Sequence, residues 1–164
     1  MKKEDFNIKD FERLVIPDCE NKQQCKMKYT REDFEKLDFS DCKDEQQFKM
    51  KYIREVLKPQ FERVFCIETE ETVKGFPDVM CLGLRAKPSF LFPAVFVEFK
   101  YSNAQGKIKF QPTQPAFYRA NDDVMHTSVV AYNKKTNTVH FFTVRHLFDK
   151  DSPYCMNEKA EVQL

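Results

Sequence analysis

The sequence predicts an α/β domain with a central mixed β-sheet flanked by helices. Segments with helical and strand-like patterns follow one another in the order helix, three strands, helix, two strands. Residues 93–101 (PAVFVEFKY) form the most strand-like run, because β-branched and aromatic residues dominate it. The chain has 164 residues and 17 Phe, which is enough for one domain with a sizeable core.

A duplicated segment precedes the predicted sheet. Residues 11–32 and 34–55 are identical at 13 of 22 positions, at an offset of 23 residues. We therefore expect an N-terminal duplicated helical segment whose first copy forms a helical extension over residues 1–40, followed by the main domain over residues 41–164. The first copy is interpreted either as a peripheral helix or arm that binds a protein partner, or as a tolerated duplication without a role of its own.

The second copy has the stronger helical pattern. Its apolar residues recur at helical spacing, at Phe48, Tyr52, Ile53, Val56 and Leu57. In the first copy, Thr30 and Asp33 weaken the same stripe. The second copy is therefore predicted to be a core helix that ends near Lys58-Pro59, because a proline disfavours helical backbone at the residue before it.

The remaining elements follow from runs of strand-forming residues and from turn residues. The expected strands are Arg63–Glu68, Asp78–Leu84, Pro93–Tyr101, Thr127–Tyr132 and Thr138–Val144. A polar loop over residues 102–109 leads into a helix that starts at Gln111-Pro112, with proline in its first turn, and runs to about Ala120. A short last helix is expected over residues 144–149.

Composition and cysteine usage limit the classes of protein. The formal net charge is only +1, which excludes a uniformly basic coat but leaves room for a local basic patch. Six cysteines occur without any CxxC pair, so a zinc ribbon has no support. The chain opens with no apolar signal-peptide run and contains no stretch of the ~18 apolar residues that a membrane span needs. We expect an intracellular protein of the cytoplasm or nucleus, with reduced thiols, neither secreted nor in a membrane.

Three charged residues in or beside predicted strands suggest chemistry. Glu98 and Lys100 are two positions apart on one strand, so their side chains share a face while Phe99 points into the core. By themselves they also fit an exposed strand edge or a cross-strand ion pair. Asp78 opens another strand, where it also fits a turn-capping role. If the two strands are neighbours, Asp78 and Glu98 can meet at one metal ion.

The order of these motifs resembles a known nuclease family. Residues 75–78 (GFPD), residues 97–100 (VEFK), a polar loop and then Gln114 at a helix start resemble the VRR-NUC branch of the PD-(D/E)XK superfamily, which is similar to Holliday-junction resolvases. The resemblance covers about residues 44–145. It implies a restriction-endonuclease-like core and a divalent-metal-dependent endonuclease that hydrolyses phosphodiester bonds in DNA, including structured or branched DNA.

The resemblance also implies roles for individual residues. Asp78 and Glu98 would hold one or two Mg²⁺ or Mn²⁺ ions, hard cations that prefer oxygen ligands. The backbone carbonyl of Phe99 would add an oxygen ligand. Lys100 would orient or help activate the attacking water, or stabilise the charge that develops on the phosphate.

The resemblance implies two further catalytic residues, both on helices. The family often has a Glu at the start of the first core helix, and Glu45 matches it best. The first copy has Lys22 at the position of Glu45, whereas it has a glutamate, Glu32, at the position of Glu55. A catalytic role that is confined to the second copy therefore fits Glu45 better than Glu55. The family's Gln on the later helix is matched by Gln114, with Gln111 as the alternative because the preceding loop is longer than usual.

A local excess of positive charge suggests contact with nucleic acid. Between residues 100 and 119 the formal charge is +4, with no Asp or Glu, although a solvated loop has the same composition. The residues expected to bind nucleic acid are Lys74, Lys107, Lys109, Gln111, Tyr118 and Arg119, with Tyr118 stacking on bases.

DNA is favoured over RNA as the substrate. The alternatives are an RNA-directed endonuclease and a weakly active or inactive nuclease-fold protein that binds nucleic acid or a protein. A homodimer fits the resemblance to junction enzymes.

Overall fold

The computed structural model of the chain describes residues 37–67, 75–84, 94–121 and 123–164. The first copy of the repeat, at residues 11–32, lies outside this range, as does Lys74. The predicted extension over residues 1–40 is therefore described only from residue 37 onward.

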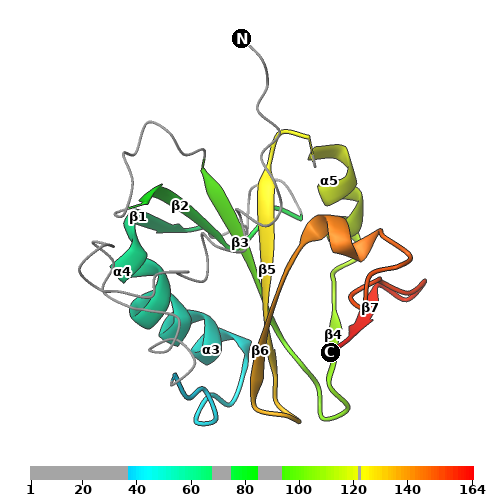
Figure 1. Cartoon of the computed structure of the whole chain (residues 1–164), viewed down its shortest axis with the longest axis horizontal. Coiled ribbons are helices and arrows are strands. Elements are labelled where there is room, and N and C mark those ends of the chain that lie inside the picture. The colour runs from blue at the N-terminus through cyan, green and yellow to red at the C-terminus, as the bar shows by residue number, and fades with distance from the viewer. Residues whose placement is uncertain (1–36, 68–74, 85–93, 122) are drawn as a thin grey trace.

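Five strands form the central sheet (Figure 1). They are β1 (Phe61–Cys66), β2 (Val79–Leu84), β3 (Val95–Tyr101), β5 (His126–Asn133) and β6 (Thr138–Thr143), in the spatial order β1-β2-β3-β5-β6. The β3–β5 pair is parallel, and the other three pairs are antiparallel. The prediction of an α/β domain with a central mixed sheet is confirmed. The first strand begins earlier than predicted, because Phe61 already has extended backbone directly after the helix.

Helix α3 (Glu45–Tyr52), the π-helical turn η1 (Ile53–Leu57) and α4 (Lys58–Gln60) form one continuous helical segment. The Asp44 side chain caps its start by accepting a 2.8 Å hydrogen bond from the backbone N–H of Gln47. Pro59 lacks the N–H that an α-helix would offer to the Glu55 carbonyl, and the wider π-helical turn lies directly before it. The predicted core helix, ending near Lys58-Pro59, is confirmed.

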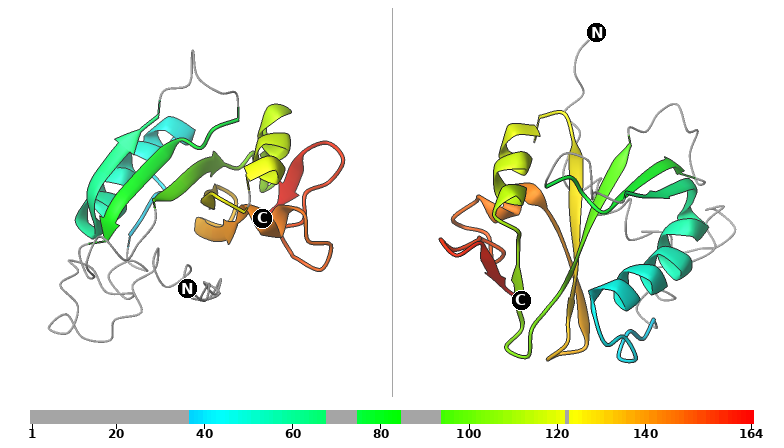
Figure 2. Two further views of the ribbon diagram at one scale, coloured as in Figure 1. Left: turned by 90° about the horizontal axis from the view of Figure 1, so that it is seen from above. Right: turned by 180° about the vertical axis from the view of Figure 1, so that it is seen from behind.

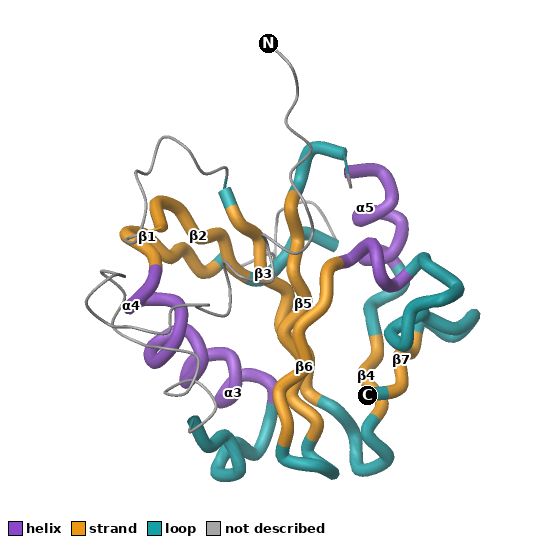
Figure 3. Tube along the Cα trace, viewed as in Figure 1, coloured by secondary structure: helices purple, strands orange, loops and turns teal. Residues whose placement is uncertain are grey.

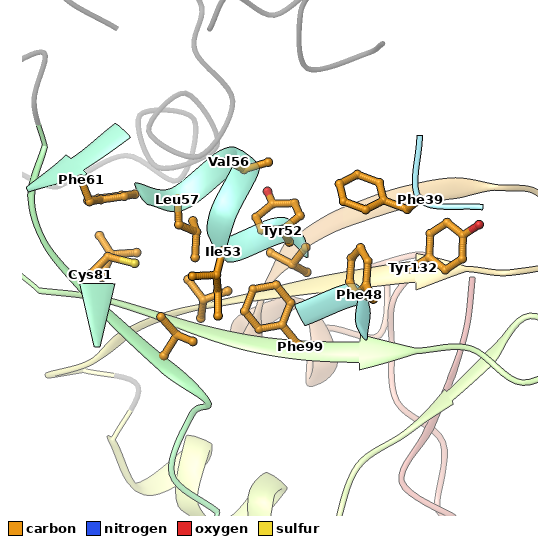
Figure 4. Close-up of a cluster of buried hydrophobic side chains, with 14 of the residues drawn as sticks. Phe39, Phe48, Tyr52, Ile53, Val56, Leu57, Phe61, Cys81, Phe99 and Tyr132 are labelled. Carbon is orange, nitrogen blue, oxygen red and sulfur yellow. The ribbon is translucent and has the colours of Figure 1, made fainter. Parts of the chain in front are cut away.

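The apolar face of this helical segment covers one face of the sheet (Figures 2 and 4). All five residues of the predicted stripe are buried. The Phe48 ring is at the centre of an aromatic cluster whose other members are Phe39, Tyr52, Phe99 and Tyr132. Phe39 precedes the predicted domain start at residue 41, so this core takes a side chain from the segment assigned to the extension.

Truncating Phe48 tests how much this cluster stabilises the fold. The side chain is 0% exposed, so Phe48→Ala is expected to lower the free energy of unfolding by about 3–5 kcal/mol through lost burial and a cavity. Met50 is on the same helix but 49% exposed, and Met50→Ala should change that free energy by less than about 0.5 kcal/mol. Urea unfolding followed by circular dichroism measures both, and equal losses would contradict the described packing.

The opposite face of the sheet is covered by α5 (Thr113–Asn121), the 3₁₀ helix η3 (Val144–Leu147) and a small second sheet (Figures 1 and 3). That small sheet pairs β4 (Lys107–Lys109) with β7 (Glu161–Gln163) in antiparallel fashion. The prediction of a polar loop over residues 102–109 is therefore wrong for residues 107–109, which form a strand. Each of these strands has one buried apolar residue, Ile108 or Val162, and that is too little for sequence alternation to reveal them.

The last predicted helix is shorter than expected, since η3 ends at Leu147. Within the part of the chain that the structure describes, no helix combines the length and apolar character needed to cross a membrane.

Candidate functional site

The pairing of β2 with β3 brings the predicted acidic residues together. The two strands are antiparallel with Val79 opposite Val97, and Asp78 directly precedes β2. The Asp78 Oδ2 atom accepts a 2.8 Å hydrogen bond from the backbone N–H of Phe99. This hydrogen bond ties Asp78, the residue before β2, to the backbone of β3. It holds the Asp78 carboxylate beside Glu98, the residue before Phe99.

A tight turn before β2 fixes the position of Asp78. Gly75 has a φ of +101°, and a Cβ atom there would lie 3.0 Å from the Thr113 carbonyl oxygen at the start of α5. Phe76 packs against the rings of Phe96 and Phe117. The turn is therefore wedged between β3 and α5, and its glycine is required both by backbone conformation and by close approach.

Gly75→Ala is expected to lower the free energy of unfolding by about 1–3 kcal/mol through backbone strain, and also to displace Asp78 and weaken divalent-metal binding. Gly83→Ala is the matched control. Gly83 has a φ of +66° at the other end of β2, so the control shares the strain but should leave metal binding unchanged. Thermal unfolding and a Mn²⁺ titration of both variants check this, and equal metal affinities would contradict the positioning role of the turn.

Glu98 has a buried carboxylate whose two oxygens differ in their hydrogen bonding. Its Oε1 atom accepts hydrogen bonds from Lys100 Nζ at 2.5 Å and from Gln114 Nε2 at 2.6 Å. Its Oε2 atom is buried and accepts no hydrogen bond within 3.5 Å, and the equally buried Tyr118 hydroxyl lies near this carboxylate. Desolvation raises the pKa of Glu98 to about 7, reinforced by the charge of Asp78 and opposed by Lys100 and Gln114. An unpartnered buried carboxylate oxygen is costly, so Oε2 marks a position at which a ligand would be stabilised.

Lys100 lies on the same face of β3 as Glu98, as strand alternation predicts. Its Nζ atom is 5.3 Å from the centre of the Phe110 ring, and the residue is only 6% exposed. Desolvation lowers the pKa of Lys100, but the charges of Glu98 and Glu45 outweigh it and leave that pKa above its ordinary value. The ammonium is therefore held protonated beside the carboxylate.

Gln114, rather than Gln111, supplies its side chain to this site. The backbone N–H of Gln111 donates a 2.9 Å hydrogen bond to Gln114 Oε1, which fixes the amide so that Nε2 faces Glu98. The side chain of Gln114 is buried, whereas Gln111 is exposed. The loop between Lys100 and Gln114 is longer than usual because it contains strand β4.

Glu45 reaches the site from the start of α3. Its Oε2 atom accepts a 3.1 Å hydrogen bond from the backbone N–H of Tyr101. Desolvation raises the pKa of Glu45, opposed by the charge of Lys100. Glu55 instead forms an ion pair with Arg54 at 2.7 Å. Of the two glutamates weighed from the sequence, Glu45 is the one placed beside Lys100 and Asp78.

One predicted role is wrong and one residue was missed. Tyr118 cannot stack on a base, because its ring is 2% exposed and its hydroxyl is buried. It lies one helical turn after Gln114, on the same inward face of α5. Desolvation, then the charge of Glu98 and the closeness of the Tyr118 hydroxyl to that carboxylate, raise the pKa of Tyr118. Lys49 was missed, although it lies one turn after Glu45, and its Nζ atom is 3.2 Å from Asp78 Oδ1.

The other residues expected to contact nucleic acid lie on the surface. Lys107 and Lys109 are exposed on β4, on either side of the buried Ile108. Arg119 is exposed on α5, with its guanidinium 4.5 Å from the centre of the Phe148 ring. These cations are available to solvent on the α5 side of the sheet, the side that Glu98 and Lys100 also face.

The donor set suits a hard divalent cation held in part by water and substrate. Among the described residues, no group of three or more His, Cys, Asp or Glu side chains forms a ready-made metal cluster. Mg²⁺ commonly takes one or two carboxylates and completes its shell with water and phosphate oxygens. Asp78 and Glu98, with the unpaired Oε2 atom, match that pattern. Soft or nitrogen-preferring metals have no comparable donors in this group.

Comparisons with protein families, with curated proteins and with solved structures found no match to this chain.

Proposed function

We propose that this protein is a divalent-metal-dependent endonuclease that hydrolyses phosphodiester bonds in DNA, with Asp78, Glu98 and Lys100 at its active centre. The order of its elements and its mixed sheet are compatible with the restriction-endonuclease-like core that its motifs resemble. Mg²⁺ or Mn²⁺ is the cofactor that the carboxylate donors favour.

The observation that carries this proposal is the convergence of Asp78, Lys100 and Gln114 on the buried carboxylate of Glu98. These residues come from the turn before β2, from β3 and from α5, and Glu98 Oε2 accepts no hydrogen bond within 3.5 Å. Keeping an unsatisfied carboxylate oxygen in the interior costs stability, and such costs concentrate at functional sites.

Each residue has a separable task in phosphodiester hydrolysis. A cation held by Asp78 and Glu98 would supply charge neutralisation for the phosphate and acidify a bound water. Gln114 orients the Glu98 carboxylate through its Nε2 atom. Lys100 holds a protonated ammonium 2.5 Å from Glu98 Oε1, where it can position the attacking water or stabilise charge that builds up on the phosphate. Glu45, near both Lys100 and Asp78, adds negative charge to the same group.

The exposed cations of β4 and α5 support nucleic acid as the substrate. Lys107, Lys109 and Arg119 can neutralise phosphates that flank the scissile bond without reading sequence. DNA follows from the resemblance of the motifs to resolvases rather than from these cations, which would bind either nucleic acid.

A cleavage panel tests the proposal. Wild-type protein with Mn²⁺ is incubated with single-stranded, duplex, flap and four-way-junction DNA and with RNA of the same sequence. We expect internal cleavage of at least one DNA form, and none when Mn²⁺ is replaced by a chelator. Cleavage of RNA alone would replace DNA by RNA as the substrate, and metal-independent cleavage would contradict the proposed chemistry.

Metal binding is expected to depend on pH because a proton competes for Glu98. With a pKa of about 7, Glu98 carries about half a proton at pH 7, which a bound cation must release. The apparent Mn²⁺ affinity should therefore rise about tenfold between pH 6 and pH 8. Calorimetry at each pH in two buffers of different ionisation heat measures both the affinity and the protons released. An affinity independent of pH would place the metal away from Glu98.

A further inference from the structure

The four carboxylate oxygens of Asp78 and Glu98 are occupied unequally. Asp78 Oδ2 binds the Phe99 N–H, and Glu98 Oε1 binds Lys100 and Gln114. Glu98 Oε2 has no partner. The fourth, Asp78 Oδ1, is taken by Lys49 Nζ at 3.2 Å. Of the two oxygens not held by β3 or α5, Glu98 Oε2 is unpaired and Asp78 Oδ1 already binds a cationic side chain.

Lys49 differs from Lys100 in how firmly it is held. Lys100 is buried between Glu98 and the Phe110 ring. The Lys49 side chain is 18% exposed and its partner Asp78 is 25% exposed, so water reaches this ion pair. A lysine on a flexible stem at a hydrated site can leave its carboxylate at small cost. Lys49 is thus the more exposed cation of the site and Lys100 the more deeply buried one.

We propose that Lys49 is a positioning residue that holds Asp78 in the metal-free protein and competes with the divalent cation for it, so that Lys49 sets the metal affinity of the site. This inference rests on the proposed function, because it takes Asp78 and Glu98 as the cation ligands. The physical reason is electrostatic. A positive charge already at Asp78 Oδ1 offsets part of the attraction for a divalent ion, and the ion pair must break before that oxygen can become a ligand.

Mn²⁺ titration calorimetry of the full-length protein, without nucleic acid, tests this inference. Lys49→Met removes the charge and should strengthen Mn²⁺ binding about two- to fivefold, the fold-change that corresponds to a partly exposed ion pair. Lys49→Arg keeps the charge and should bind Mn²⁺ with nearly wild-type affinity. Lys51→Met is the matched control, because Lys51 is two residues further along α3 and pairs with Asp41 at 2.6 Å instead. Its affinity should equal that of the wild type.

The possible outcomes separate this inference from the proposed function. If the wild type binds no Mn²⁺, the cation site itself is wrong. If the wild type binds Mn²⁺ and Lys49→Met binds it equally or more weakly, only the role of Lys49 is wrong. Thermal unfolding of each variant identifies a merely structural lysine, whose loss lowers stability without strengthening metal binding. If Lys49→Met does not fold, Lys49→Gln takes its place with the same expected gain in affinity.

Discussion

Replacing Lys100 with methionine is expected to lower the rate of Mn²⁺-dependent DNA cleavage by about 10²- to 10⁴-fold, the range found when a group that transfers protons or stabilises charge is removed from an active centre. Methionine is close to lysine in length and apolar, so it can keep the contact with the Phe110 ring while the ammonium is lost. Single-turnover cleavage rates at saturating Mn²⁺ measure the loss.

The pH dependence of this variant separates two reasons for its loss of activity. Lys100 lowers the pKa of Glu98, so without it that pKa rises above about 7 and metal binding shifts to higher pH. Rates measured at rising pH until the metal affinity of the variant no longer increases, so that Glu98 is ionised again, leave only the contribution of Lys100 to water or phosphate. If the wild-type rate returns completely on that plateau, Lys100 acts solely through the charge of Glu98 and its assignment as a catalytic residue is wrong.

Asp78→Asn is expected to weaken Mn²⁺ binding at least about 100-fold, because the site loses one of its two carboxylate charges. The fold should tolerate the change, since an asparagine oxygen can still accept the hydrogen bond from the Phe99 N–H. Titration calorimetry measures the affinity, and urea unfolding shows that the variant is folded.

Asp41→Asn is the control for this variant. Asp41 is an exposed carboxylate that pairs with Lys51, so its loss changes the net charge by the same amount outside the site. It should bind Mn²⁺ as the wild type does. If Asp78→Asn and Asp41→Asn bind Mn²⁺ equally well, Asp78 is a turn-capping residue and not a metal ligand.

Local periodicity explains what the sequence could predict about the fold. The helix over residues 45–60 was predictable because its apolar stripe repeats within a few turns of one segment. The strands of the central sheet were predictable because β-branched and aromatic runs are local as well. Strands β4 and β7 were not, because each is three residues long and its partner is distant in the sequence.

The sequence could predict those parts of the candidate site in which one strand, or one pair of strands, fixes the relative positions of the side chains. Glu98 and Lys100 share a face by alternation alone, and Asp78 joins them because β2 pairs with β3. Gln114 could not be separated from Gln111 without the path of the loop, whose end forms β4. The role given to Tyr118 was wrong because the sequence does not tell which face of α5 is turned inward. Lys49 was within reach, since a residue one helical turn after Glu45 lies on the same face.

The most direct test of the central claim is Mn²⁺-dependent cleavage of DNA by the wild type and by Asp78→Asn, measured side by side on the substrate that the panel selects. In the structure Asp78 binds the Phe99 N–H and Lys49, and the neighbouring Glu98 carboxylate has a buried, unpaired oxygen. We predict cleavage by the wild type that starts with Mn²⁺ and stops with chelator, and no cleavage by a folded Asp78→Asn protein. Cleavage at the same rate by both proteins would contradict the claim that this site is the metal-dependent active centre.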